Sequence, residues 1–533
     1  MKLYHSDGFK THRYNVTGYS PISTVYSIPL FLYICRMAAI KPSVPKGTRD
    51  FSPAEMAKRN FIFDTIKAVF RKYGYLQIET PSMENLSTLT GKYGDEGDKL
   101  MFKILDSGDY LSDYDLRLIR AEQIDDLTYR SASFLIERKK LPRELELLWD
   151  ELDDNDKLKQ LRRSMDSDIT EKALRYDLTV PFARYVVQHQ NEITFPFKRF
   201  QVQPVWRADR PQKGRYREFF QCDADVVGSD SLLNEAEFIL IYDEALSNLG
   251  LKDFTIKINN RKILSGIADI IGKSDNIIDL TVAIDKLDKI GLDGVIKELL
   301  EKGFTAEDIE QLKPVILLEG SNTTKLQSLR TALAASAMGL KGCEEIESVF
   351  SYINHFNLQN ATIELDITLA RGLNYYTGAI FEVKTNEVAM GSIGGGGRYD
   401  DLTGMFGLKG LTGAGISFGA DRIYDVMEEL NLFPEDANQS TQVLICCFDK
   451  EGELFALPLL QQLRDNDINT ELYPAGTKIK KQLDYANNKN IPYTVVIGSD
   501  EMQSGVLTFK DMTSGIQEKL TAKEIIEKLT TGL

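Results

Sequence analysis

Apolar residues recur at helical spacing over residues 54–73, which predicts an amphipathic helix ending at Gly74. Residues 75–80 follow, with apolar and polar side chains mixed, and end just before Pro81. The proline ring disfavours a helical conformation in the residue before it, so we expect a strand there. A helix over residues 54–73, followed at once by a strand over residues 75–80, is therefore predicted.

Two longer stretches also have helical spacing. Residues 106–172 mix dense charges of both signs with leucines, which predicts a surface helical hairpin. A solvated insertion is favoured there over an extra RNA or oligomer contact. From Asn260 to about Gln359, leucines and isoleucines recur with interspersed lysines, which predicts a second helical region.

The C-terminal hundred residues have a different pattern. Residues 431–440 contain Pro, Asp, Asn and Ser and are typical of a linker. Four strand-like stretches follow and alternate with helical ones, at residues 442–448, 469–473, 493–497 and 506–510. This alternation predicts a small α/β domain with a largely parallel sheet.

Composition narrows the class of protein. The chain has 533 residues, 43% hydrophobic and 27% charged, enough for roughly three or four domains. Its net charge of −15 argues against binding nucleic acid over the whole surface, so any RNA contact must use local basic patches. Five cysteines and four histidines show no CxxC pair and no zinc spacing, so we expect no protein-held metal.

The first 36 residues need separate treatment. Their apolar run, residues 28–34, is interrupted by Pro29 and is too short to span a bilayer. Met37 and the residues after it read like a cytosolic start, so we expect residues 1–36 to be an extension outside the native chain. A cleaved export signal is the alternative. The expected location is cytoplasmic, with no membrane partner.

Candidate chemistry is concentrated in a few segments. Residues 369–378 carry an arginine and two tyrosines, and the glycine run 394–397 follows with residues 398–400. Because glycines have no side chains, a small anionic substrate that forms hydrogen bonds could lie close against the backbone of a sheet at this glycine run. Either segment alone is weak evidence, because most glycine runs are turns.

Residues 205–218 place arginines 207, 210, 215 and 217 around a Pro-Gln-Lys-Gly turn. Such a hairpin loop can grip phosphate oxygens bidentately, although a solvated charged hairpin is the plainer interpretation. Residues 413–422 read as a small-residue strand running into a helix with Arg422 on its first turn. A flat ring can approach that backbone, and the arginine can reach a terminal phosphate or stack on a base.

Taken with residues 174–184 and 220–225, these segments resemble the signature motifs of class II aminoacyl-tRNA synthetases, specifically the histidyl-tRNA synthetase family. The resemblance runs from Lys46 to Leu533 apart from the charged insertion. Separated motifs occur in the family's order, which makes chance agreement far less probable than for any one of them. The matching segments are the entry segment 45–51, the first class motif 78–81, the second around Arg207, the third at 413–422, and the histidine-specific motifs 369–378 and 394–400.

The resemblance implies an α/β fold with three parts. An α+β catalytic domain with an antiparallel sheet flanked by helices would occupy residues 37–432, interrupted by the charged insertion and by a helical insertion at about 260–359. That helical insertion is implied to approach the acceptor arm of tRNA, and a plain packing module is the alternative. Residues 441–533 would be an anticodon-binding domain. The first class motif implies a homodimer.

The implied reaction is ATP-dependent. L-histidine would react with ATP to give histidyl-adenylate and pyrophosphate, and histidine would then pass to the 3′ end of tRNA(His). Two anions must meet in the first step, so cations should carry the chemistry. The one histidine near the motifs, His189, is interpreted as structural, which argues against a histidine general base. Magnesium is expected with ATP. The alternatives are a catalytically silent paralogue acting as a histidine-sensing regulatory subunit, and an RNA-binding scaffold.

The resemblance also assigns roles to single residues. The catalytic candidates are Arg371 and Arg207, with ATP contacts from Arg207, Asp209, Arg215 and Arg422. The histidine-binding candidates are Asp177, Thr179, Gln221, Asp225, Arg371, Tyr375, Tyr376 and Tyr399. The tRNA-binding candidates are Arg210, Gln212, Lys478, Lys480 and Lys481.

Some of these assignments have plainer alternatives. Asp177 and Asp225 could form ordinary salt bridges to nearby arginines, and the lysines could belong to a solvated helix. Two residues depart from the family pattern: Asn374 stands where the family usually has Asp, and Asp225 where bacterial members often have Glu. Both bear on the fine selectivity of the site.

Overall fold

The computed structural model describes residues 42–107, 170–370, 375–434 and 441–531. The predicted N-terminal extension, most of the charged insertion with its predicted helical hairpin, and the candidates Arg371 and Asn374 lie outside the described residues. Among the described residues, no helix is both long enough and apolar enough to cross a membrane.

The predicted first helix is confirmed as α1 (Pro53–Lys72). It begins with a capping box, in which Ser52 and Glu55 each accept a hydrogen bond from the other's backbone amide. Strand β1 (Leu76–Gln77) follows and is shorter than predicted. It pairs only with β5, since it lies at the edge of the sheet.

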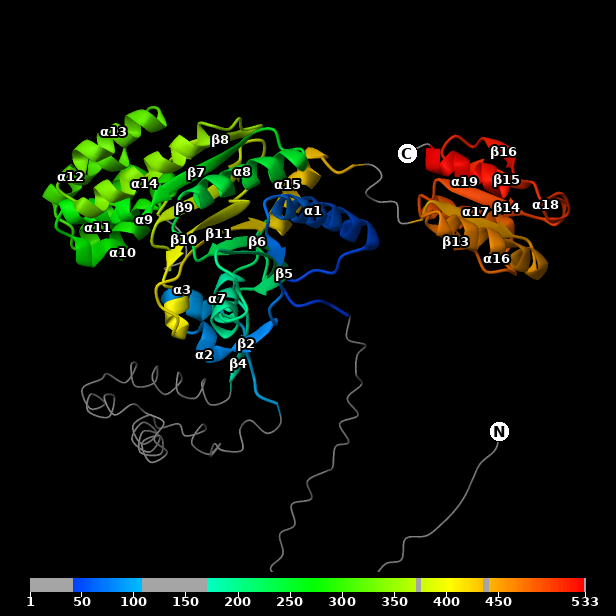
Figure 1. Ribbon diagram of the computed structural model, residues 1–533, viewed down its shortest axis with the longest axis horizontal. Coiled ribbons are helices and arrows are strands. Elements are labelled where there is room, and N and C mark those ends of the chain that lie inside the picture. Colours follow the sequence, from blue (N-terminus) through cyan, green and yellow to red (C-terminus); the bar gives the residue numbers. More distant parts are fainter. Residues whose placement is uncertain (1–41, 108–169, 371–374, 435–440, 532–533) are drawn as a thin grey trace, which may run out of the picture. The chain divides into compact units, whose positions relative to one another are not determined.

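An eight-stranded sheet forms the centre of the part of the chain before the C-terminal domain (Figure 1), in the order β1-β5-β6-β11-β10-β9-β7-β8. The outer pairs β1–β5 and β7–β8 are parallel and all the others are antiparallel, as the family resemblance implied. Helices α1, α8 (Leu233–Asn248) and α15 (Ala420–Leu430) pack against its central strands. The remaining strands are β5 (Phe197–Trp206), β6 (Glu218–Val227), β7 (Phe254–Asn260), β8 (Ala361–Leu365), β9 (Ala379–Thr385), β10 (Gly394–Asp400) and β11 (Thr412–Gly419).

Alternation along β6 separates the hydrophobic core from the polar face of the sheet. Cys222, Ala224 and Val226 are buried in the main core cluster together with α1 and α8. Gln221, Asp223 and Asp225 point to the other face, because successive strand residues face opposite sides. This second face carries the candidate site.

The predicted helical region lies between β7 and β8 and is confirmed. Helices α9 and α14 approach closely at a glycine pair, where a Cβ on Gly266 would lie 2.4 Å from the Gly339 Cα. Their apolar residues join the main core cluster, so this region packs against the sheet. Its helices are α9 (Arg261–Ile270), η2 (Ser274–Asn276), α10 (Ile277–Ile284), α11 (Leu287–Glu301), α12 (Ala306–Ile316), α13 (Asn322–Ala332) and α14 (Ala337–Ile353).

A smaller unit covers the polar face of the large sheet. It has a three-stranded sheet in the order β2-β4-β3, and a core cluster that includes Leu89, Tyr93, Phe182 and Tyr399. The elements are β2 (Met83–Asn85), α2 (Leu86–Leu89), α3 (Gly94–Leu100), β3 (Lys103–Ile104), β4 (Lys172–Leu174), α7 (Thr179–Gln188) and η3 (Thr403–Phe406).

The C-terminal residues form a separate five-stranded sheet, β13-β12-β14-β15-β16. The predicted parallel arrangement is right for β13, β12 and β14 but wrong for β15, which runs antiparallel to β14. The reason is the short chain between β14 and β15, since a parallel crossover needs a dozen or more residues. Strand β16, which was not predicted, runs antiparallel to β15. The elements are β12 (Val443–Cys447), α16 (Lys450–Asp465), β13 (Thr470–Leu472), α17 (Ile479–Asn488), β14 (Tyr493–Ile497), α18 (Ser499–Ser504), β15 (Leu507–Asp511), β16 (Gln517–Leu520) and α19 (Ala522–Thr531).

Candidate active site

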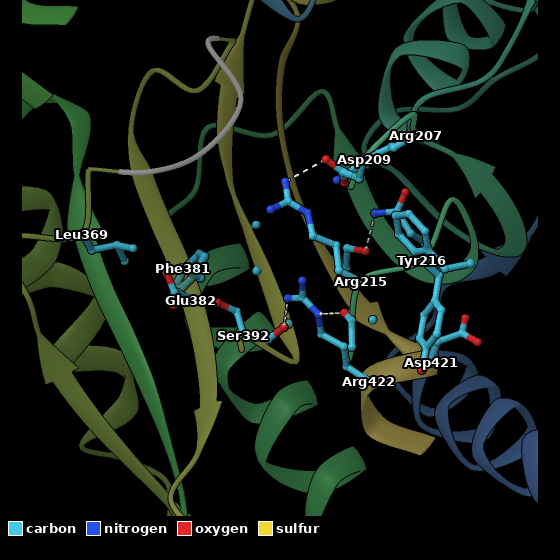
Figure 2. Close-up of a pocket in the computed structure, with 18 of the residues that line it drawn as sticks. Arg207, Asp209, Arg215, Tyr216, Leu369, Phe381, Glu382, Ser392, Asp421 and Arg422 are labelled. Atoms are coloured by element: carbon cyan, nitrogen blue, oxygen red, sulfur yellow. Dashed lines mark hydrogen bonds and ion pairs between the residues drawn. The ribbon is translucent and has the colours of Figure 1, made fainter. Parts of the chain in front are cut away.

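Two connected cavities lie on the polar face of the large sheet. The larger one, about 280 Å³, is bounded by the β5–β6 loop, strands β9 to β11 and the start of α15 (Figure 2). The smaller one, about 40 Å³, lies beside it against β6 and β11. Both are lined by Arg207, Gln221, Tyr376, Gly395 and Ser417. A molecule in the small cavity would therefore meet one in the large cavity at these residues.

Three arginines line the large cavity. Arg207 and Arg215 come from the predicted hairpin loop, and Arg422 from the first turn of α15 (Figure 2). Arg422 donates from Nε to the Gly214 carbonyl and from Nη1 to the Ser392 carbonyl, both at 2.6 Å. Burial, followed by repulsion from Arg207 and Arg215, lowers the pKa of Arg422. The cavity thus presents three guanidinium groups, which can bind phosphate oxygens, beside the carboxylates of Asp209, Glu382 and Asp421.

Arg207 lies at the junction of the two cavities. Its Nε donates to the Tyr176 carbonyl at 3.1 Å, and its guanidinium carbon lies 4.3 Å from the centre of the Tyr176 ring. Arg215 pairs instead with Asp209, Nη2 to Oδ1 at 2.7 Å. The carboxylate of Asp209 therefore orients Arg215 in the large cavity.

Glycines make the floor of the site flat. A Cβ on Gly397 would lie 2.8 Å from the Tyr376 ring, on the cavity face of the strand, whereas one on Gly394 would lie 2.7 Å from the Tyr242 ring, on the core face. The Tyr242 hydroxyl lies within hydrogen-bond distance of the Gly395 and Ser417 carbonyls. The glycine run is therefore a strand, β10, whose side-chain-free surface faces the cavity, and not a turn.

Asp177 lines the small cavity and is buried, with 2% of its surface exposed. Its carboxylate accepts hydrogen bonds from the Tyr93 hydroxyl at 2.9 Å, the Tyr375 hydroxyl at 3.1 Å and the Val180 amide at 3.1 Å. Burial raises its pKa, although these hydrogen bonds and Arg207 oppose the rise. The plainer interpretation of Asp177, a salt bridge to an arginine, is not what the described residues show.

Asp225 both forms a salt bridge to an arginine and lines the small cavity. Its Oδ2 lies 2.8 Å from Nη2 of the buried Arg199, directly opposite it on β5, and its Oδ1 accepts a hydrogen bond from the Tyr399 hydroxyl at 2.6 Å. Gly415 faces Asp225, since a Cβ there would lie 2.0 Å from Asp225 Oδ1. Burial raises its pKa and Arg199 counteracts this.

The other predicted histidine-binding residues also gather here. Thr179, Gln221, Tyr375, Tyr376 and Tyr399 all line the small cavity. The Gln221 side-chain amide donates to the Ser417 hydroxyl at 2.9 Å. The half-buried Tyr376 has its pKa raised, first by desolvation and then by the nearby carboxylates. The site is thus rich in oriented polar groups around a space of small volume.

Sequence reasoning missed four polar residues of this site: Asp223, Ser417, Arg199 and Tyr93. Asp223 and Ser417 line the small cavity, while Arg199 and Tyr93 hold its carboxylates. A signal for Asp223 existed, since it alternates with Gln221 and Asp225 on one strand. Nothing local to Tyr93 could have linked it to Asp177.

The predicted tRNA contacts line neither described cavity. Arg210 is exposed, and Gln212 contributes a backbone bridge to Arg215 at the tip of the β5–β6 loop. Lys478, Lys480 and Lys481 are exposed at the start of α17, in the C-terminal part. Among the described residues, no group of three His, Cys, Asp or Glu side chains could hold a metal ion.

Comparison with known proteins gives consistent matches. A family model described as histidyl-tRNA synthetase matches residues 47–112 and 145–423, and a model described as anticodon binding domain matches residues 442–531. A histidine–tRNA ligase of Cytophaga hutchinsonii is 55% identical over 489 residues, covering 92% of this chain and 99% of the relative. One of Bacteroides fragilis is 55% identical over 492 residues, covering 92% and 100%.

Solved structures agree in fold. The crystal structure of histidyl-tRNA synthetase from Nostoc sp. PCC 7120 matches with a TM-score of 0.71 and 28% identity, covering 93% of this chain and all of that one. An ATP phosphoribosyltransferase regulatory subunit/histidyl-tRNA synthetase from Bacillus halodurans C matches with a TM-score of 0.60 and 19% identity, covering 84% and 97%. The second likeness concerns the fold alone.

Proposed function

Because the chain belongs to the histidyl-tRNA synthetase family, we propose that it is a histidine–tRNA ligase. It activates L-histidine with ATP and transfers histidine to the 3′ end of tRNA(His). The observation that supports this most strongly is the pair of joined cavities, a small one with carboxylates and tyrosines opening into a large one with three arginines. An amino acid and a nucleoside triphosphate fit these two chemistries.

In the activation step, a carboxylate oxygen of histidine attacks the α-phosphorus of ATP, and the bond from that phosphorus to pyrophosphate breaks. Arg207 is proposed to neutralise both anions, because it lies where the two cavities meet. Arg215 and Arg422 hold the terminal phosphates, with Asp209 orienting Arg215. From the family resemblance, Arg371 is proposed to bridge the substrate carboxylate and the α-phosphate.

Mg²⁺ is proposed to accompany ATP, held mainly by phosphate oxygens and water. The carboxylates of Asp209 and Glu382 on the wall of the large cavity are oxygen ligands of the kind Mg²⁺ prefers. The ion supplies neutralisation of the β- and γ-phosphates, and the arginines of this chain supply their orientation.

Recognition of histidine is assigned to the small cavity. Asp177, Thr179 and Gln221 are proposed to bind the α-ammonium group, with Asp225 and Tyr376 at the imidazole and Tyr399 supporting Asp225. Wrong amino acids would leave these buried polar groups unpaired, which can give discrimination of roughly ten-thousand-fold or more.

For the transfer step, the adenylate phosphate is the proposed base. tRNA contacts are proposed for Arg210, Gln212 and the three lysines of α17, with residues 441–533 as the anticodon-binding domain. A homodimer is proposed through the first class motif, and the exposed apolar side chains of Leu76 and Met83 beside it favour a protein contact there. The transfer step, the tRNA contacts and the dimer can each be tested separately from adenylate formation.

The regulatory-subunit alternative is not favoured. A paralogue without catalysis would not need the motif arginines or an anticodon-binding domain, whereas Arg207, Arg215 and Arg422 all line the large cavity and residues 442–531 match an anticodon-binding model. A scaffold that only binds RNA would not need the amino-acid cavity.

The test is histidine-dependent exchange of pyrophosphate into ATP without tRNA. Exchange that requires histidine and collapses in Arg371→Ala supports the ligase. A folded protein that binds histidine without exchange would instead support the regulatory subunit.

A further inference from the structure

Three carboxylates surround the small cavity, and their partners differ. Asp177 accepts three hydrogen bonds, and Asp225 has a tyrosine on one oxygen and an arginine beside the other. Asp223 has only 2% of its surface exposed, and its Oδ1 is buried with no hydrogen-bond partner among the described residues. An unpaired buried carboxylate oxygen is costly, and such atoms call for a ligand or a function.

Neighbouring polar groups do not supply the missing partner. Gln201 lies opposite Asp223 on β5, but its amide donates to Thr80 and Gln203. Ser417, opposite on β11, hydrogen-bonds to the Asp223 carboxylate and receives the amide of Gln221. The contact with Ser417 leaves Oδ1 of Asp223 without a hydrogen-bond partner among the described residues, beside the small cavity.

The charged groups around Asp223 are of both signs. Asp225 and Asp177 repel its charge, and Arg199 attracts it. Burial, the largest cause, together with these carboxylates raises the pKa of Asp223 to about 7. The titratable and charged groups that face it are Asp177 before α7, Arg199 on β5, Arg207 just after β5, Asp225 on β6, Tyr242 on α8, and Tyr376.

The order of residues along β6 indicates which part of histidine meets Asp223. Gln221 lines both cavities, whereas Asp223 and Asp225 line only the small one. In the proposed reaction the histidine carboxylate must lie at the junction, next to the α-phosphate, and the α-ammonium is bonded to the adjacent carbon. The imidazole is farther from the carboxylate and so extends toward Asp223 and Asp225.

We propose that Asp223 binds the imidazole of histidine, with its Oδ1 accepting a hydrogen bond from a ring N–H. This inference rests on the proposed function and adds a specificity-determining residue to it. A neutral imidazole has one N–H, from which Asp223 accepts, and the Tyr376 hydroxyl can donate to the other ring nitrogen. Asp225, fixed by Arg199 and Tyr399, lies beside the ring.

The experiment compares wild type with Asp223→Asn in pyrophosphate exchange. We expect the KM for histidine to rise about tenfold at pH 8, because the neutral amide oxygen of Asn is a weaker hydrogen-bond acceptor than a carboxylate oxygen, with the KM for ATP unchanged. The ratio of the two histidine KM values should shrink toward pH 6, where the wild-type carboxyl is protonated. An unchanged histidine KM at pH 8 overturns the proposal.

A second measurement separates the ring from the ammonium group. Imidazolepropionic acid, which is histidine without its amino group, should inhibit wild type competitively, and Asp223→Asn should weaken its Ki by the same factor as the histidine KM. A variant that weakens histidine but not this analogue would place Asp223 at the ammonium group and overturn the ring assignment.

Controls keep the test independent of folding and of the reaction itself. Asp223→Ser is a second variant that removes Oδ1 and is expected to give the same Ki ratio. Asp243→Asn replaces another buried aspartate, which accepts backbone amides of residues 359–361 and lines neither cavity, so the histidine KM should not change. Wild-type exchange that needs no histidine would refute the ligase, whereas equal wild-type and variant behaviour would refute only the role of Asp223.

Discussion

At the scale of single residues, the site depends on glycines, which have no Cβ atom, as much as on its polar side chains. Gly415 and Gly396 leave no room for a Cβ, and their backbones bring Asp225 and strand β11 close to the cavity. Polar side chains then fill the space that glycines leave. Small substitutions here should therefore change ligand affinity directly.

Gly415→Ala is expected to raise the histidine KM at least tenfold, because its Cβ would lie 2.0 Å from Asp225 Oδ1 and must displace that carboxylate. Kinetics of pyrophosphate exchange measure the effect. Gly419→Ala in the same strand is the matched control for the histidine KM, since Gly419 lines only the large cavity and its Cβ would meet the Ile393 carbonyl at 3.5 Å, an ordinary contact. Equal histidine KM values in both variants would contradict the argument.

Asp223 should also make stability depend on pH. Its folded pKa of about 7 lies above the usual 3.8, so the folded state binds the proton more tightly than the unfolded state. This contribution is fully present below the unfolded pKa and is lost as pH rises toward 7. Over that range the loss is about 1.4 kcal/mol for each pH unit.

Urea unfolding of wild type and Asp223→Asn, measured from pH 5 to 8 without ligand, tests this sign. The stability of the variant relative to wild type should increase with pH. A difference that is constant over this range would show that Asp223 does not titrate there in the folded protein.

At the scale of elements, Asp421 connects parts that are distant in sequence. Its Oδ1 lies 2.5 Å from Arg49 and 2.5 Å from Arg59 of α1, and its Oδ2 accepts the Phe220 amide of β6 at 2.8 Å. It stands beside Arg422 at the start of α15. The same aspartate thus joins α1, β6 and α15 next to the phosphate cavity.

Asp421→Asn should destabilise the protein by about 3–5 kcal/mol, because it leaves the buried Arg59 guanidinium without its carboxylate. Chemical denaturation monitored by circular dichroism measures the loss. Asp425→Asn on the same helix is the control, with a smaller expected loss, since Asp425 accepts from Tyr216 and burial already raises its pKa. A loss no greater than in the control would argue against this role for Asp421.

At the scale of the whole molecule, the hydrophobic clusters fall into two sets. The clusters containing α1 and Tyr93 lie within residues 62–427, and those of the C-terminal sheet lie within residues 443–529. Among the described residues, no hydrophobic cluster combines side chains from both sets. Each part therefore has its own core.

Ending the chain after Phe433 should preserve histidine-dependent pyrophosphate exchange and abolish charging of tRNA(His). The cavities are lined only by residues before this point, whereas the match to an anticodon-binding domain lies beyond it. Exchange and aminoacylation assays on the truncated and full-length proteins measure the two steps. Loss of exchange in a truncated protein with native circular dichroism would contradict this separation.

The sequence by itself determined the elements and the order of the motifs. Helix α1, the helical region before β8, the arginine hairpin and the small-residue strand leading into α15 follow from local periods and turn residues, because these depend on neighbours a few positions apart. The family resemblance then indicated the antiparallel sheet and the candidate residues. The roles assigned to all the candidate residues, those of Arg371 and the tRNA-binding residues included, stay predictions.

Only the tertiary structure decided how the carboxylates differ from one another. Which of Asp177, Asp223 and Asp225 is paired depends on Tyr93, Arg199 and Tyr399, which come from separate elements. The direction of β15 likewise depended on the reach of the chain before it. Burial and charge arise from segments distant in sequence that meet in space, so a local pattern records which residue types are present but not which of them lacks a partner.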